Sequence, residues 1–335
     1  MRTVRRILSV SVIAVVLATS SQAAPALAAG PQVVVLGNLP GGCCSQAFAV
    51  NDQGVVVGQS MVGTGENPPE RPFRWQNGVL TDLGTLGGPR AVATAINNNG
   101  WIVGYSELAG GGGLAHAFLW RPGHGMTDLG SLGETSIATG INDSGVVVGR
   151  YVADGQLHGF RWANGVMAKI VTPTGEGFDP VGVNGNGKIG GSLTAEYSGD
   201  PAWWKNGQTV ASGLSGHASA INDNGDVTGT YWDGTQGAFV WRADGTVLHL
   251  TMPAGARFAA TNGINESRHT VGTRTTASGN VRAVYWSEFG TPRLLPGLVP
   301  GGQSTAYGMN RRGQTVGQAN LTATGGDYVA VLWTS

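Results

Sequence analysis

Apolar and polar residues alternate along this chain in short runs, and the same order of runs recurs at a near-constant spacing. In residues 91–133, a short apolar run ends at an Asn, an Asn-x-x-Gly reversal follows, and a second apolar run ends at a Gly. Alternation with a period of two residues, bounded by Gly and Asn, predicts short β-strands joined by tight turns. The Asn recurs at Asn51, Asn97, Asn142, Asn184, Asn222, Asn265 and Asn310, and the Gly at Gly58, Gly104, Gly149, Gly191, Gly229, Gly272 and Gly317.

A third apolar run in each copy closes with a tryptophan. These are Trp75, Trp120, Trp162, Trp204, Trp241, Trp286 and Trp333. In the copy described above, the four strands are expected at residues 93–97, 101–104, 116–120 and 126–130. Four antiparallel strands repeated every 40 to 45 residues or so predict the blades of a β-propeller. A large ring at one position of every copy is expected to be a packing residue.

The two ends of the repeat array predict that the ring closes. The seventh copy reaches Trp333 and stops at Ser335, so it lacks a fourth strand. Residues 32–42 (QVVVLGNLPGG) match the fourth-strand segment of the first copy at residues 79–88 (VLTDLGTLGG). The predicted fold is therefore all-β, a seven-bladed β-propeller of four-stranded antiparallel blades whose last blade is completed by the N-terminal strand. Closure of this kind removes exposed sheet edges.

The amino-acid composition agrees with an all-β globular fold. Of 335 residues, 57 are Gly, 12% are charged and 41% are hydrophobic, which argues against a disordered chain and against one that spans membranes throughout. The repeats run from residue 46 to residue 335 and share one period. Residues 29–335 are therefore expected to form a single propeller domain.

The first 28 residues follow a different pattern. Three arginines among the first six residues precede an apolar run at residues 7–19, and residues 26–28 (ALA) suit cleavage. This predicts a signal peptide at residues 1–28 and a secreted, extracellular protein, with Sec and twin-arginine export both open. The apolar run is shorter than the roughly 20 residues of a spanning helix, so no stable membrane insertion is expected after cleavage. Removal of the signal leaves 17 basic and 20 acidic residues, a net charge of about −3, which argues against a nucleic-acid partner.

Three segments resemble a known repeat family. They are HAFLW at residues 116–120, AINNNGWIVG at residues 95–104 and MTDLGSLG at residues 126–133. They are similar to the extracellular HAF repeat family of bacterial exported proteins, and the resemblance extends over the chain from Gln32 onward. It implies an exported repeat protein and carries over no catalytic residue. In the fourth to seventh copies the His-Ala-Phe element is replaced, so no role that needs this His in every blade is expected.

No group of residues predicts catalysis. His116 and His158 occupy equivalent positions in successive copies, which favours a structural polar contact over a metal site, whose ligands must converge. Asp82 and Asp128 also share one repeat position and are expected to bind a neighbouring backbone group. The Asn-Asp-x-Gly turns supply fewer oxygen ligands than the about six to eight that calcium takes. We therefore expect no catalytic residue, no metal and no cofactor.

The loops that differ between copies are the expected binding surface. Loops between second and third strands, and linkers between blades, open on one face of a ring built this way. Aromatic, acidic and Arg side chains on such loops stack on sugars or anchor a protein. The residues expected to bind are Tyr105, Tyr151, Tyr231, Trp232, Asp233 and Arg274; the same loops carry Glu107, Asp154, Glu196 and Tyr197, and the linkers carry Arg90, Glu134, Phe178, Asp179, Arg257 and Phe258.

These observations favour a secreted, non-catalytic and monomeric repeat protein that binds an extracellular glycan or protein through the variable loops. An extracellular polysaccharide lyase or hydrolase is an alternative, with carboxylates from different blades meeting at the mouth of the ring. A purely structural envelope protein is a third possibility.

The chain contains two cysteines, Cys43 and Cys44, which are adjacent in sequence. Disulfides persist in exported proteins, so a Cys43–Cys44 bond is expected at the seam between the closing strand and the first blade. A bond between neighbours closes a strained ring, and two loop thiols are the alternative.

Overall fold

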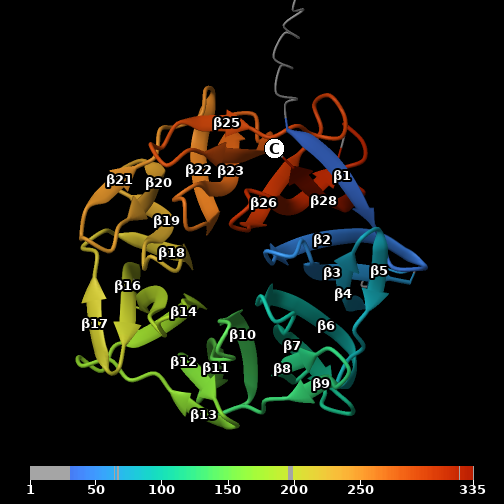
Figure 1. Ribbon diagram of the computed structural model, residues 1–335, viewed down its shortest axis with the longest axis vertical. Coiled ribbons are helices and arrows are strands. Elements are labelled where there is room, and N and C mark those ends of the chain that lie inside the picture. The colour runs from blue at the N-terminus through green and yellow to red at the C-terminus, as the bar shows by residue number, and fades with distance from the viewer. Residues whose placement is uncertain (1–30, 64, 66–67, 195–198, 324, 335) are drawn as a thin grey trace, which may run out of the picture. The chain divides into compact units, whose positions relative to one another are not determined.

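The computed structural model describes residues 31–335, except residues 64, 66–67, 195–198, 324 and 335 (Figure 1). The predicted signal peptide at residues 1–28 lies outside the described residues, as do Glu196 and Tyr197. No helix in the described part of the chain is long and apolar enough to cross a membrane.

The described residues form seven four-stranded antiparallel sheets around a central axis, which confirms the predicted seven-bladed β-propeller (Figure 1). Blade 1 contains β2 (Gly42–Val50), β3 (Val56–Val62), β4 (Glu70–Gln76) and β5 (Val79–Asp82). Blade 2 contains β6 (Gly87–Ile96), β7 (Ile102–Leu108), β8 (Ala115–Arg121) and β9 (Gly125–Asp128). Blade 3 contains β10 (Thr135–Ile141), β11 (Val147–Ala153), β12 (Gln156–Ala163) and β13 (Val166–Lys169).

The other four blades follow the same order. Blade 4 contains β14 (Gly177–Val183), β15 (Ile189–Thr194), β16 (Gly199–Lys205) and β17 (Gln208–Ala211). Blade 5 contains β18 (Gly216–Ile221), β19 (Val227–Trp232), β20 (Gln236–Trp241) and β21 (Val247–His249). Blade 6 contains β22 (Ala256–Ile264), β23 (Thr270–Thr276), β24 (Val281–Trp286) and β25 (Pro292–Leu294). Blade 7 contains β26 (Ser304–Met309), β27 (Thr315–Asn320), β28 (Tyr328–Thr334) and, from the other end of the chain, β1 (Gln32–Gly37).

The N-terminal strand closes the ring as the sequence predicts. β1 pairs with β28 in antiparallel register, with Gln32 opposite Thr334 and Val35 opposite Val331. In Figure 1 the blue β1 lies beside the red β28. The closing strand is shorter than the predicted residues 32–42, because β1 ends at Gly37 and Gly42 already begins the inner strand of blade 1.

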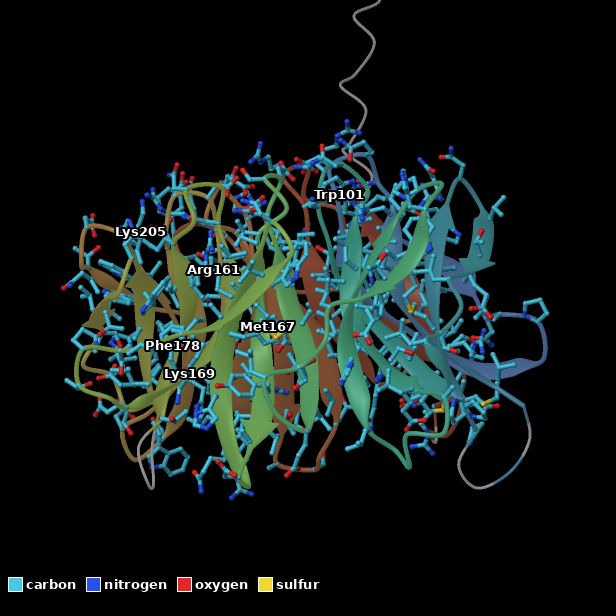
Figure 2. The ribbon with its side chains drawn as sticks, turned by 90° about the horizontal axis from the view of Figure 1, so that it is seen from below. Trp101, Arg161, Met167, Lys169, Phe178 and Lys205 are labelled. Atoms are coloured by element: carbon cyan, nitrogen blue, oxygen red, sulfur yellow. The ribbon has the colours of Figure 1, made fainter. Side chains whose placement is uncertain are left out.

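The ring has two different faces. The turns from first to second and from third to fourth strands lie on one side, which we call the turn face; Trp101 and Lys205 lie toward it, at the top of Figure 2. The loops from second to third strands and the linkers between blades lie on the opposite side, the loop face, and Phe178 and Lys169 lie lower in the same view. The turns use the predicted residues, since Gly54 and Gly100 have positive φ and Arg268, which replaces Gly in the sixth copy, has a φ of 63°.

The repeated Asn residues join the blades to one another. In all seven copies the side-chain oxygen accepts a hydrogen bond from the backbone N–H four residues on, and the side-chain amide donates to the backbone oxygen of the Asn in the following blade. All seven side chains are buried. One residue type therefore stabilises its own turn and the interface with the next blade.

The repeated Gly is required because two backbones approach closely. A Cβ at Gly58 would lie 1.8 Å from the carbonyl oxygen of Gln46 on the paired strand, and one at Gly104 would lie 1.9 Å from that of Val92. In the other five copies the corresponding distance is between 1.9 and 2.4 Å. No side chain fits at such distances, so any substitution would push the first two strands of the blade apart.

The core lies between adjacent blades, and the repeat Trp contributes to it unequally from one blade to another. Phe73, Phe118, Phe160 and Phe239, two residues before the repeat Trp, are fully buried. Trp241, Trp286 and Trp333 are buried as expected, but Trp75, Trp120, Trp162 and Trp204 are only half-buried. These four tryptophans lie toward the end of their strands, where each packs against a core cluster and remains partly accessible.

Candidate functional site

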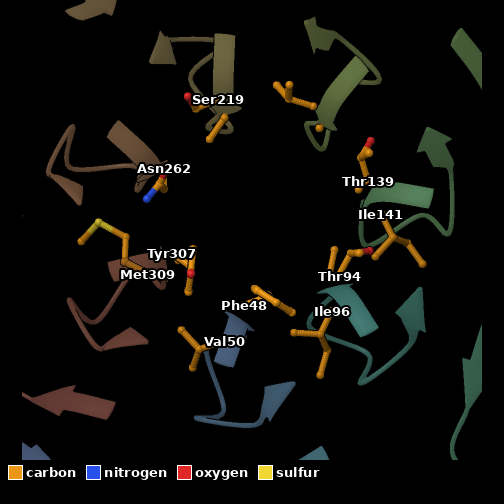
Figure 3. Close-up of a pocket in the computed structure, with 18 of the residues that line it drawn as sticks. Phe48, Val50, Thr94, Ile96, Thr139, Ile141, Ser219, Asn262, Tyr307 and Met309 are labelled. Atoms are coloured by element: carbon orange, nitrogen blue, oxygen red, sulfur yellow. The ribbon is translucent and has the colours of Figure 1, made fainter. Parts of the chain in front are cut away.

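A β-bulge occurs at the same place in the inner strand of every blade. It falls three residues before the repeat Asn, where one extra residue interrupts the pairing with the second strand. A bulge leaves one residue unpaired and redirects its side chain. The seven bulge residues are Phe48, Thr94, Thr139, Val181, Ser219, Asn262 and Tyr307, and all of them line the axis of the ring (Figure 3).

The bulge residues surround a cavity of about 670 Å3 on the axis. This volume is within the range of small-molecule sites, about 300 to 1,000 Å3. Gln59, Glu70 and Tyr105 extend the lining between blades 1 and 2 toward the loop face, because Glu70 begins the third strand of its blade there. The repeat thus builds seven equivalent positions around one cavity and fills them with different side chains.

The wall of the cavity is aromatic on one side and polar on the other. Phe48 and Tyr307 pack edge to face, with ring centroids 5.2 Å apart. On the polar side, the Thr94 hydroxyl donates to the carbonyl oxygen of Ala138 in the next blade at 2.8 Å. Thr139 and Asn262 make the same kind of bond to blades 4 and 7. The polar wall is therefore held in place by bonds between blades.

The seven residues that immediately precede the repeat Asn residues form an apolar layer on the turn-face side of the bulge residues. This layer consists of Val50, Ile96, Ile141, Val183, Ile221, Ile264 and Met309. These residues line both the cavity and a charged mouth on the turn face, so the wall between the two is apolar.

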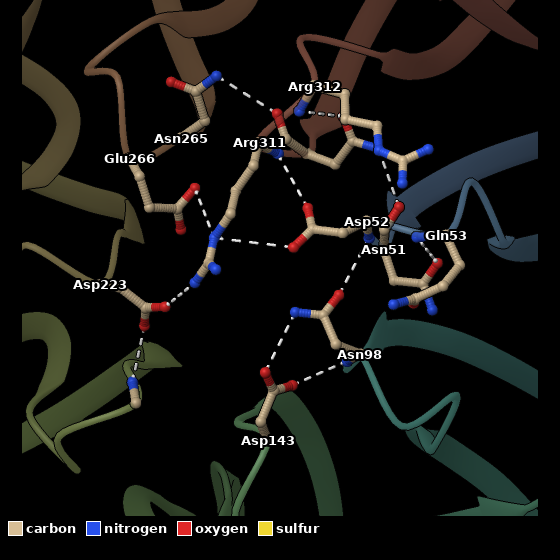
Figure 4. A network of polar contacts seen from close by, with 12 residues as sticks. Asn51, Asp52, Gln53, Asn98, Asp143, Asp223, Asn265, Glu266, Arg311 and Arg312 are labelled. Atoms are coloured by element: carbon tan, nitrogen blue, oxygen red, sulfur yellow. Dashed lines mark hydrogen bonds and ion pairs between the residues drawn. The ribbon is translucent and has the colours of Figure 1, made fainter.

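Arg311 lies across the turn-face mouth (Figure 4). Its Nε lies 3.4 Å from a carboxylate oxygen of Glu266 and 3.7 Å from one of Asp52, and its Nη2 contacts the carboxylate of Asp223. These carboxylates, Glu266 first, raise the pKa of Arg311. Arg311 thus joins acidic side chains of three other blades.

Tyrosine phenols near the cavity are held in the neutral form. Burial raises the pKa of Tyr105, and the charge of Glu70 adds to that effect. Burial also raises the pKa of Tyr307. Gln46 contributes a polar chain beside them, because it accepts a hydrogen bond from Gln59 at 2.8 Å and contacts Gln318. The site therefore presents neutral phenols, amides and one carboxylate.

The structure separates the residues that the sequence grouped into one binding surface. Tyr105 lines the cavity, but Tyr151 is 5% exposed and lies within the core, with its ring 5.2 Å from that of His158. Tyr231 is half-buried against His249, with ring centroids 4.6 Å apart. The reason is register: Tyr105 follows the repeat Gly by one residue, whereas Tyr151 and Tyr231 follow it by two and point to the other face of the sheet.

The remaining predicted residues lie apart from the cavity. Arg274 is half-buried opposite Arg282 on the neighbouring strand of blade 6. Trp232 is 56% exposed and lines a shallow pocket of about 370 Å3 with His217 and Gln236. Asp233 accepts hydrogen bonds from the backbone and hydroxyl of Thr235, and these bonds lower its pKa. Trp232 therefore remains available for binding, whereas Asp233 stabilises its own turn.

The repeated acidic residues have the structural role expected of them. The carboxylates of Asp82 and Asp128 accept hydrogen bonds from the backbone N–H of Gly84 at 2.8 Å and Gly130 at 2.7 Å. His116 contacts Asp128 at 3.0 Å, which agrees with a structural polar contact for this histidine. Among the residues that the structure describes, no group of three or more His, Cys, Asp or Glu could hold a metal ion.

The two cysteines lie at a bulge in β2, where Cys43 is exposed and Cys44 is buried, and both are free thiols. Burial first, and then a side-chain hydrogen bond with Cys43 that favours the protonated thiol, raise the pKa of Cys44 to about 11. The disulfide between Cys43 and Cys44 stays a prediction.

The seven bulge residues were missed by sequence reasoning. The available signal is their fixed distance from the repeat Asn: the residue before them is Ala in five copies, as at Ala47 and Ala93, whereas the bulge position changes from aromatic to hydroxyl to aliphatic. When the residue type at one position differs between copies and its neighbour stays small, the side chain at the variable position is expected not to pack in the core.

The sequence matches no family model and no curated protein. Among solved structures, the chain is similar to a streptogramin B lyase, with a TM-score of 0.60 and 11% identity over 91% of this chain and 97% of that one. It is also similar to the β-propeller domain of the Trilobed protease from Pyrococcus furiosus, described as having an open velcro topology (TM-score 0.57, 10% identity, 87% and 94% covered). A third similar structure is the acylaminoacyl peptidase of Pyrococcus horikoshii (TM-score 0.54, 12% identity, 82% and 49% covered). Identities this low show a shared fold and nothing further.

Proposed function

We propose that this chain is a secreted, non-catalytic and monomeric propeller of the extracellular HAF repeat family that binds a saccharide. The loop face receives the ligand, and one end of it enters the axial cavity. The Asn and Gly positions of the repeat are kept in all copies, whereas the bulge positions that face this cavity hold six residue types in seven blades.

The observation that carries the proposal is the set of seven bulges that turn unlike side chains into one cavity. A purely structural ring needs no such variation, because identical side chains would fill the axis equally well. Diversified positions on a repeated scaffold are where binding proteins of this architecture gain specificity.

A saccharide fits the chemistry of the wall. A sugar ring has apolar C–H faces, which pack on aromatic rings, and hydroxyl groups, which exchange hydrogen bonds with polar side chains. Phe48 and Tyr307 supply the aromatic surface, Asn262 supplies an amide beside Tyr307, and Ser219 supplies a hydroxyl across the cavity (Figure 3).

Binding is favoured over hydrolysis by the number of carboxylates. Glycoside hydrolysis generally requires two carboxyl groups, roughly 5 to 9.5 Å apart, on opposite sides of the scissile bond. Of the described residues that line the cavity, Glu70 is the one with a carboxylate. A polysaccharide hydrolase would therefore have to draw its second carboxyl group from outside this cavity.

The test is a glycan array followed by calorimetric titration with the full mature chain. We expect at least one oligosaccharide to bind, and Tyr307→Ala to weaken that binding by about 30-fold, because one aromatic contact in a cavity contributes about 2 kcal/mol. Phe289→Ala is the matched control, because Phe289 is a 75% exposed ring on blade 6 that does not line the cavity.

Two results would replace the proposal. Release of shorter or unsaturated products from a bound oligosaccharide would identify an enzyme. Absence of binding across the array, with a protein retained by the loop face instead, would make the ligand a protein.

A further inference from the structure

Glu70 is the charged side chain of the axial cavity. The other described lining residues are aliphatic, aromatic, hydroxyl or amide, and no Lys or Arg is among them. Some acidic residues elsewhere in the ring have basic partners: Asp82 pairs with Arg71 at 3.0 Å, and Asp179 with Arg150 at 3.4 Å. The half-buried carboxylate of Glu70 has neither a hydrogen bond nor an ion pair with any described residue.

A carboxylate without a counter-ion attracts cations, and the attraction increases when a ligand displaces water from the cavity. Arg90 and Arg150 lie close enough to Tyr105 to lower its pKa, against the larger effect of burial, but neither lines the cavity. Arg150 pairs with Asp179, and Arg71, which follows Glu70 in the chain, pairs with Asp82. Among the described residues, no basic side chain forms an ion pair with Glu70.

Aromatic rings share the cavity with Glu70. Phe48, Tyr105 and Tyr307 line the same cavity, and the phenols are neutral because burial raises the pKa of both tyrosines. The faces of such rings attract ammonium groups, and the attraction increases when water is excluded. A carboxylate combined with aromatic faces is a combination that binds a protonated amine.

We infer that the ligand of the axial cavity carries a protonated amine, which Glu70 binds among Phe48, Tyr105 and Tyr307. For a saccharide this means an amino sugar with a free amine. The inference rests on the proposed function for the saccharide part of the ligand and on the unpaired carboxylate for its charge. An acidic sugar is disfavoured, because its carboxylate would face Glu70.

Calorimetric titration of the full mature chain with three tetrasaccharides tests the inference. The probes are β-1,4-linked tetramers of glucosamine, of N-acetylglucosamine and of glucose, which differ in charge at one position of each ring. We expect glucosamine to bind about 10 to 100 times more tightly than the other two, as a hydrogen-bonded charge contributes about 1.5 to 3 kcal/mol. Glu70→Gln should remove this preference and leave the affinity for the glucose tetramer unchanged.

Glu107→Gln is the matched control, since Glu107 is an acidic residue of the neighbouring blade that lies outside the cavity lining. It should keep the full preference for glucosamine. A loss of preference in both variants would mean that the ligand responds to the overall negative charge of this side of the ring, and would overturn the assignment to Glu70. The unfolding midpoint of each variant shows whether it is folded.

The possible failures are distinguishable. If the three tetramers bind equally and Glu70→Gln has no effect, saccharide binding stands and the amine inference is wrong. If no tetramer binds but spermidine or triglycine does, in a manner that depends on Glu70, the amine inference stands and the saccharide is wrong. If none of these probes binds, both are wrong.

Discussion

The side-chain amide of Asn310 lies 2.9 Å from the backbone oxygen of Asn51, and 259 residues of the chain separate the two. The same bond joins each earlier pair of blades, for example Asn51 to Asn97 at 3.1 Å. Asn310 therefore closes a circle of amide-to-carbonyl bonds on the inner side of the ring. The pairing of β1 with β28 closes the outer side of the same blade. Ring closure has two independent components, one from strand pairing and one from asparagine.

Replacement of Asn310 should therefore destabilise the whole ring. Asn310→Ala removes the donor to Asn51 and the acceptor for the backbone N–H of Gln314, which lie in a buried region. Each buried group left without a partner costs about 1 to 3 kcal/mol. We expect the free energy of unfolding in urea to fall by roughly 2 to 5 kcal/mol.

Asn186→Ala is the matched control for this measurement. Asn186 is an exposed asparagine in the corresponding turn of blade 4, so its replacement should change the stability by less than about 0.5 kcal/mol. Equal effects of the two substitutions would show that the asparagine circle does not hold the blades together.

The sequence predicts the blades well because Asn and Gly act locally. Asn51 and Gly58 are each required by the geometry of their own copy, so their spacing is visible in one sequence. The circle of asparagine bonds was not predicted, because the side-chain amide donates to another blade. The bulge at Phe48 also escaped prediction, since a bulge depends on how two strands pair and not on the residue that it redirects.

The candidate site was predicted in part for a related reason. Tyr105 and Trp232 remain available to a ligand, whereas Tyr151 and Tyr231 are packed. All four belong to second strands near the loop face, so their loops give no reason to distinguish them. The difference is their distance from the repeat Gly, which sets the face of the sheet on which each side chain lies.

The core should depend more on the repeat Phe than on the repeat Trp in blade 2. Phe118 is fully buried, so Phe118→Ala should lower the free energy of unfolding by about 3 to 5 kcal/mol. Trp120 is half-buried, and Trp120→Ala should cost roughly 1 to 2 kcal/mol. Trp333→Ala, at the equivalent position of blade 7 where the indole is buried, should resemble Phe118→Ala. A Trp120 effect as large as that of Phe118 would contradict this ranking.

The two cysteines should differ in their reactivity with iodoacetamide. The pKa of Cys44 is raised from 9.0 to about 11, so at pH 8 its thiolate fraction is about 100-fold below that of an ordinary thiol. Alkylation of Cys44 should therefore be slow at pH 8 and rise about tenfold per pH unit up to pH 11, as followed by peptide mass spectrometry. The pKa of Cys44 is higher in the folded protein than in the unfolded chain. The contribution of this thiol to the free energy of unfolding is therefore complete below pH 9 and is lost as the pH rises through 11.

The same measurement decides whether the vicinal disulfide forms in the exported protein. A bonded pair would resist alkylation at both sulfurs until a reductant is added, and its mass would be two daltons lower than that of the reduced chain. Rapid alkylation of exposed Cys43 without reductant would show that the pair is reduced.

Trp232 and Tyr231 are adjacent, yet their replacement should have opposite consequences. Trp232 is exposed and lines a shallow pocket, so Trp232→Ala should change the stability by less than about 0.5 kcal/mol. Tyr231 packs against His249, and a Cβ at Gly237 would lie 2.6 Å from its ring, so this ring fills a confined space. Tyr231→Ala should therefore lower the free energy of unfolding by about 2 kcal/mol or more.

If a bound glycan extends from the axis over blade 5, Trp232→Ala should weaken the binding of long oligosaccharides about 30-fold and leave the binding of short ones unaffected. Equal losses for long and short oligosaccharides would exclude Trp232 as a separate contact, and a strong loss of stability would make it a packing residue.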